Sequence, residues 1–77
     1  MKFNLKPEEK IAAYHFTRSE LEKNLLLRLT IAGFNPDEFN EETFVPDSDS
    51  TVQNDIYLLI AKIKDLSAKI EKIESQQ

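Results

Sequence analysis

The sequence predicts an all-α fold, a small helical hairpin or bundle of three to four helices that ends in a long amphipathic, coiled-coil-like helix. Two observations predict it: apolar residues recur at helical spacing through the last third of the chain, and helix-starting and helix-stopping residues divide the rest. With 77 residues, the chain forms one domain at most. The predicted organisation is an N-terminal helical region over residues 1–46, with helices at about 7–32 and 36–42, an acidic loop at 47–51 and an oligomerisation helix at 52–75.

The first helix is expected to begin at Pro7, because proline lacks only an N–H that the first helical turn leaves unpaired. Further along, Thr17 and Glu20 have the spacing of a capping box, which would start a second helix. No glycine or proline enforces a break there, so one helix over residues 7–32 and two helices joined by a tight corner both stay open. Leucines and isoleucines in the second half of this segment occupy more than one face, so we expect it to be contacted from more than one side.

Gly33 is the only glycine, and it follows the last apolar turn, where a left-handed residue commonly ends a helix. Asn35 and the proline after it have the pattern of a new helix start. Phe34 and Phe39 have the spacing of a hydrophobic staple around that start. These signals predict the short helix at about 36–42.

The C-terminal helix carries apolar residues that alternate four and three positions apart, without a break, over three heptads. With isoleucine at the a positions and leucine at most d positions, the pattern favours a parallel two-stranded coiled coil. An amphipathic helix in a monomeric bundle shows the same stripe over this length. The predicted oligomer interface consists of Ile56, Leu59, Ile63, Leu66, Ile70 and Ile73.

Three more apolar residues, Tyr57, Leu58 and Ile60, lie off this seam. We therefore expect the first half of the helix to lie in the protein's own core. Residues 63–73 would then project a narrower seam that a partner covers. Self-association, with a dimer favoured, is the prediction, and a monomeric helical bundle of structural role is an alternative.

Charge is distributed unevenly along the chain. The net charge of −4 divides into +2 for residues 1–33, −7 for residues 34–55 and +1 for residues 56–77. The acidic middle segment is either a solvated connector or a surface that meets a basic protein partner. In the second case the partner-binding acidic surface comprises Asp37, Glu38, Glu41, Glu42, Asp47 and Asp49.

Residues that carry enzyme chemistry are sparse. The chain has no cysteine and one histidine, His15, so a transition-metal site would need mostly carboxylate ligands. Residues 47–51 resemble the D-x-D-x-T motif of haloacid-dehalogenase-type phosphatases, but that motif requires a buried strand before it, which Pro46 opposes. The same loop lacks the glycine and glutamate of a calcium-binding loop, having Val52 and Leu58 instead. We expect no enzyme, no cofactor and no metal.

The expected function is that of a non-enzymatic, self-associating protein-interaction module, such as a small adaptor, assembly factor or inhibitor. By analogy, small acidic proteins of this kind occur among phage and mobile-element accessory proteins. The alternative is a dimeric DNA-binding regulator with a helix-turn-helix-like pair at about residues 7–32. The acidic middle segment argues against nucleic acid as a partner. No apolar run is long enough for a signal peptide or a membrane span, so we expect a cytoplasmic protein without a membrane partner.

Overall fold

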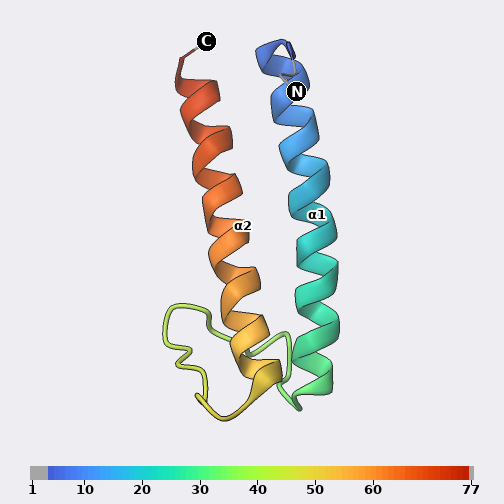
Figure 1. The fold of residues 1–77 in the computed structure, drawn as a ribbon, viewed down its shortest axis with the longest axis vertical. Coiled ribbons are helices and arrows are strands. Elements are labelled where there is room, and N and C mark those ends of the chain that lie inside the picture. Colours follow the sequence, from blue (N-terminus) through green and yellow to red (C-terminus); the bar gives the residue numbers. More distant parts are fainter. Residues whose placement is uncertain (1–3, 77) are drawn as a thin grey trace.

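Two helices, α1 (Pro7–Ile31) and α2 (Thr51–Ser75), run in opposite directions side by side in the computed structural model, which describes residues 4–76 (Figure 1). Residues 32–50 join them at one end of the hairpin, and the start of α1 and the end of α2 lie at the other end (Figure 1). The prediction of an all-α protein is confirmed. The prediction of three to four helices is wrong, because residues 4–76 contain two.

Helix α1 is continuous through the residues that could have started a second helix. The Thr17 hydroxyl donates a hydrogen bond to the carbonyl oxygen of Ala13 at 3.0 Å, as a threonine inside a helix does. Glu20 does not reach back to Thr17, because its carboxylate lies 3.3 Å from the ammonium nitrogen of Lys23. The structure therefore has one helix here and not two, and α1 lacks the corner of a helix-turn-helix pair.

The end of α1 is a Schellman motif centred on the glycine. Gly33 has a φ of +86°, and its N–H donates to the carbonyl of Thr30 at 3.1 Å. The N–H of Phe34 donates to the carbonyl of Leu29 at 2.9 Å. These two bonds satisfy carbonyls that the helix end leaves open, and Phe34 is turned back onto Leu29.

Residues 36–42, predicted to be a short helix, form turns instead. The side-chain oxygen of Asn35 accepts a hydrogen bond from the N–H of Asp37 at 3.0 Å. Five residues later, the Asn40 side chain accepts one from the N–H of Glu42 at 2.9 Å. Such side-chain turns compete with helical hydrogen bonds, and the second interrupts the segment before a helix can propagate.

Three phenylalanines five residues apart give the loop its own packed centre. The ring centroids are 5.6 Å apart for Phe34 and Phe39, 5.7 Å for Phe34 and Phe44, and 5.2 Å for Phe39 and Phe44. In a helix, a spacing of five would place successive rings about 140° apart around the axis. The irregular loop brings all three together against Leu29 and Ile56.

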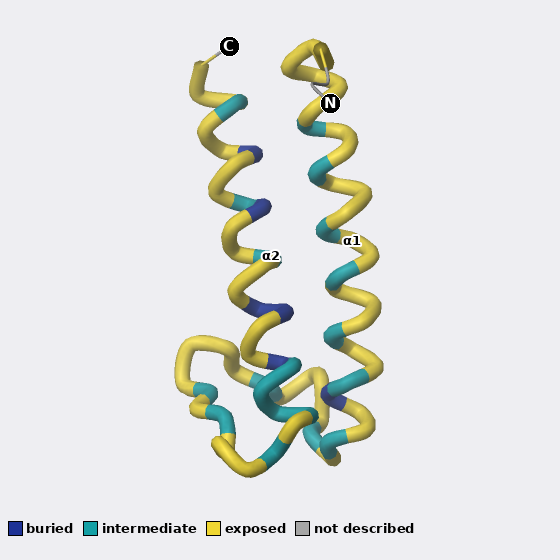
Figure 2. The backbone as a smooth tube through the Cα atoms, viewed as in Figure 1, coloured by how far each residue is buried: buried dark blue, intermediate teal, exposed yellow. Residues whose placement is uncertain are grey.

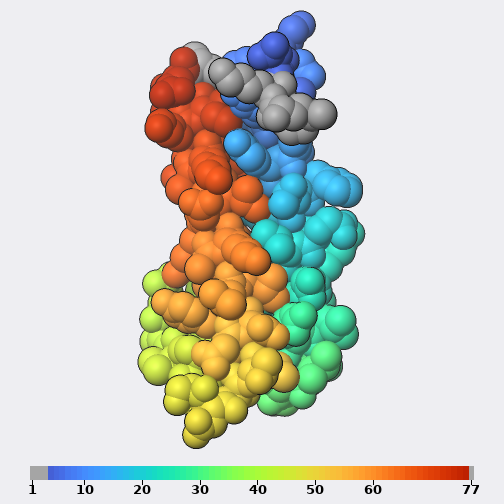
Figure 3. Space-filling model, viewed as in Figure 1, coloured from blue at the N-terminus to red at the C-terminus, as the bar shows by residue number. Residues whose placement is uncertain are grey.

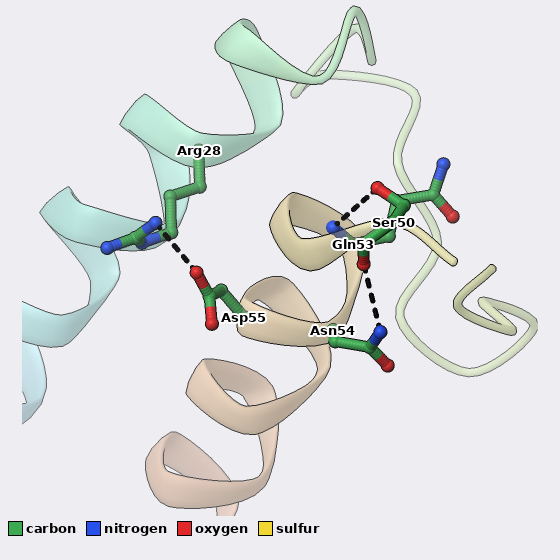
Figure 4. Close-up of polar contacts among 5 residues, drawn as sticks. All are labelled: Arg28, Ser50, Gln53, Asn54 and Asp55. Atoms are coloured by element: carbon green, nitrogen blue, oxygen red, sulfur yellow. Dashed lines mark hydrogen bonds and ion pairs between the residues drawn. The ribbon is translucent and has the colours of Figure 1, made fainter. Parts of the chain in front are cut away.

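The loop is tied to the first turn of α2. The Ser50 hydroxyl accepts a hydrogen bond from the N–H of Gln53 at 3.2 Å, as an N-cap does, and the Asn54 amide donates to the Ser50 carbonyl at 2.9 Å (Figure 4). The Gln53 side chain accepts a further bond from the N–H of Asp47 at 2.9 Å. The last residues of the loop are thus fixed by α2 itself.

The core lies between the helices and is supplied mainly by α2 (Figure 2). Helix α1 contributes one buried side chain, Leu29, and α2 contributes five: Ile56, Leu59, Ile60, Leu66 and Ile70. The body is elongated, with extents of 41 × 26 × 19 Å (Figure 3). A two-helix layer of this kind buries one face of each helix and leaves the opposite face exposed to solvent.

Replacing Gly33 by alanine is expected to lower the free energy of unfolding by about 1–2 kcal/mol. The left-handed backbone conformation is unfavourable by about this amount for an L-residue with a Cβ atom. A Cβ at this position would meet nothing within 4 Å, so the backbone is the only cause. Gly33→Asn should cost less, since asparagine tolerates this conformation better. Urea denaturation measures both, and equal losses would contradict the explanation.

Candidate functional site

The predicted oligomer interface on α2 faces α1 of the same chain. Four of its residues are buried and two are half-buried: Ile56, Leu59, Leu66 and Ile70, and then Ile63 and Ile73. Helix α1 runs beside this stripe and supplies its cover (Figure 2). Two chains could therefore pair through the stripe only if α1 gave up this contact.

Polar contacts across the helix pair fix its register. The Arg28 guanidinium lies 3.2 Å from the Asp55 carboxylate near the loop end (Figure 4). The Arg18 guanidinium donates to the Ser67 hydroxyl at 3.2 Å near the middle. The ion pair is partly exposed, so its net contribution is of the order of 1 kcal/mol or less. Its main consequence is to set which turn of α1 meets which turn of α2.

The predicted acidic surface is displayed on the connecting loop. All six carboxylates are exposed: Asp37, Glu38, Glu41, Glu42, Asp47 and Asp49. The Glu42 carboxylate lies 3.8 Å from the Lys64 ammonium, which connects the loop to one flank of α2. Because the phenylalanine cluster and the Asp47 contact anchor the loop backbone, these charges are held in place at one end of the hairpin.

Two shallow hollows of about 260 Å³ each lie between α1 and α2. The one near the loop is lined by Leu21, Asn24, Arg28, Asp55, Leu58 and Lys62, among others. The one near the termini is lined by Lys10, Tyr14, Lys69, Lys72, Ile73 and Gln76. Basic side chains therefore border the groove at both ends.

Lys69 makes the most specific contacts in the terminal hollow. Its ammonium lies 3.1 Å from the Asp65 carboxylate and 6.0 Å from the centre of the Tyr14 ring. The hydrogen bond to Asp65 raises the pKa of Lys69 above its ordinary value. Lys69 of α2 thus lies beside Tyr14 of α1 near the terminal ends of the two helices.

Metal-ligating side chains do not gather into a cluster in the part of the chain that the structure describes. Residues 4–76 contain no group of three or more histidine, cysteine, aspartate or glutamate side chains placed to hold a metal ion. His15 is exposed on α1, with its Nδ1 3.0 Å from an Arg18 nitrogen.

The side of α1 that faces away from α2 carries exposed apolar side chains that belong to neither the predicted oligomer interface nor the predicted acidic surface. Phe16 is 69% exposed, Leu27 59% and Ile31 64%. At about 100° per residue, these three lie within about 60° of one another around the helix axis. The sequence signal that indicates this surface is the surplus of apolar residues beyond one face of this segment.

Comparisons with protein-family models, with curated proteins and with solved structures find no significant match. Within residues 4–76, neither helix is both long and apolar enough to cross a bilayer.

Replacing Phe39 by alanine should lower the free energy of unfolding by about 2 kcal/mol, less than a fully buried phenylalanine because its ring is only half-buried. It should also speed proteolytic cleavage within residues 35–49, since the cluster anchors the loop. Val45→Ala is the matched control, because Val45 is in the same loop but 83% exposed. Similar cleavage rates for the two variants would show that the cluster does not hold the loop.

Proposed function

We propose that this chain is a non-enzymatic protein-interaction module that associates with a second copy of itself and binds another protein. The observation that carries the proposal is an excess of exposed surface. A compact monomer of 8.9 kDa exposes about 4,800 Å². This chain exposes 5932 Å². The excess is comparable with the roughly 800 Å² that each partner buries in a standard protein interface.

The shape of the molecule supports the same proposal. Its radius of gyration is 14.8 Å, whereas a compact domain of 77 residues has one of about 11.5 Å. Exposed apolar side chains accompany the extra surface, with Phe16, Leu27 and Ile31 on α1 and Tyr57 and Leu58 on α2. Leu27 and Ile31 lie one turn apart on α1, and neighbouring exposed apolar side chains of this kind are typical of protein contact sites.

The acidic loop supports the second half of the proposal, which is binding to another protein. Six exposed carboxylates on an anchored loop create a negative potential that favours a basic surface on the partner. The loop lies at one end of the hairpin, away from the middle of α1, so a partner bound there leaves most of α1 open (Figure 1). The module would thus act as an adaptor, assembly factor or inhibitor.

Sedimentation equilibrium tests self-association directly. The weight-average mass should rise from 8.9 kDa towards twice that value as the protein concentration increases through the micromolar range. The physical reason is the burial of apolar side chains that face water in the single chain. A mass that stays at 8.9 kDa at all concentrations would rule out self-association.

Binding to another protein is tested with a loop variant in which the six carboxylates are replaced by amides. The wild-type chain should retain a protein from an extract of its host, and the variant should retain much less of it, because the charge complementarity is lost. A variant with Glu8, Glu9 and Glu71 changed to glutamine controls for net charge outside the loop. Equal retention by all three proteins would show that the loop is not the binding surface.

A further inference from the structure

The outer side of α1 carries a stripe with coiled-coil spacing. Phe16, Glu20, Lys23 and Leu27 follow one another at intervals of four, three and four residues, so they share one face of the helix. All four are exposed. Among residues 4–76, no other segment runs along the side of α1 that faces away from α2 (Figure 1).

The order of residues in this stripe is self-complementary. A two-fold axis midway between Glu20 and Lys23 would bring a second α1 against the first in the antiparallel direction. Phe16 would then lie at the height of Leu27 of the partner subunit. Glu20 would lie at the height of the partner's Lys23, and the small Ala13 would lie within one residue of the partner's Ile31.

We propose that two copies of this chain pair through the outer face of α1, antiparallel, with the axis between Glu20 and Lys23. This inference rests on the self-association in the proposed function and names the surface that carries it. The product is a four-helix assembly in which both α1 helices are inside and both α2 helices are outside. Each α1 then uses one face for α2 and the opposite face for the partner.

Charge favours the antiparallel direction. In a parallel pair, Glu20 would face the partner's Glu20, and the two acidic loops would lie at the same end of the assembly. In the antiparallel pair, each Glu20 meets a Lys23, and the loops lie at opposite ends, where their mutual repulsion is weakest. Glu20 and Lys23 already lie 3.3 Å apart within one chain, so two such pairs would form a four-charge cluster around the axis.

The two ends of the stripe supply apolar contact area. Its centre is charged and its ends are apolar, so a two-fold axis would bring Phe16 beside the partner's Leu27 twice. The apolar ends are 69% exposed at Phe16 and 59% exposed at Leu27 in the single chain. Pairing would remove these side chains from water, which is the main favourable contribution to association.

A charge-swap experiment tests the surface and its direction together. Glu20→Lys and Lys23→Glu each place like charges opposite each other at two symmetric contacts, so each should raise the dissociation constant about tenfold or more at low salt. The double variant Glu20→Lys/Lys23→Glu restores opposite charges and should return the constant to within about threefold of wild type. Sedimentation equilibrium measures all of them.

Glu71→Lys is the matched control, because it makes the same charge change at an exposed site on α2. If the wild-type chain dimerises but Glu20→Lys behaves like Glu71→Lys, the outer face of α1 is not the interface, and self-association stands. If Lys62→Glu weakens the dimer more than Glu20→Lys, the second copy occupies the groove between α1 and α2, and the inference is overturned. A wild-type chain that stays monomeric overturns both this inference and the proposed self-association.

Cysteine cross-linking gives a second measurement, since the chain has no cysteine of its own. Oxidising a mixture of Glu20→Cys and Lys23→Cys chains should form disulfide-linked dimers faster than oxidising either variant alone, because the antiparallel register places position 20 beside position 23 of the partner. Equal rates in the mixture and in the separate samples would contradict this register.

Discussion

The structure depends on the packing of one apolar stripe on α2 against a single helix. Helix α2 supplies five of the six buried side chains, and α1 supplies Leu29 alone. Burying a side chain of this size stabilises a protein by about 1.5–3 kcal/mol, so the α2 stripe is the largest favourable contribution in the molecule. Because residues 4–76 contain only two helices, each helix buries one face against the other, and much of the remaining helix surface is exposed to solvent.

The loop supplies the third packing element that a two-helix layer lacks, but only at one end. The Schellman motif at Gly33 directs Phe34 back onto Leu29, and the side-chain turns at Asn35 and Asn40 bring two more rings to the same place. The loop end of the hairpin therefore has a three-sided core. Towards the termini, within residues 4–76, α1 packs against α2 without the loop, and basic side chains border the shallow groove between the two helices.

This asymmetry separates the candidate surfaces in space. The acidic side chains belong to the loop, the basic side chains border the groove, and the apolar residues Phe16, Leu27 and Ile31 belong to the outer side of α1. A second copy on α1 and a different protein on the loop would contact different residues. The two halves of the proposed function are thus physically independent, although both arise from a chain that is too small to cover its own helices.

Local signals in the sequence determined where the helices begin and end. Pro7 and Gly33 marked the ends of the helical segment at about 7–32, observed as Pro7–Ile31, but left open whether one helix or two would fill it. Ser50 placed the start of α2 within a residue or two. The same signals wrongly predicted a short helix at 36–42. The expected N-cap residue, Asn35, forms a turn as readily, and the phenylalanine cluster favours that turn. Only the tertiary structure decided what covers the stripe from Ile56 to Ile73. A periodic pattern shows that a helix needs an apolar neighbour, but it is the same whether that neighbour is a second chain or, as here, α1 folded back by a 19-residue connection.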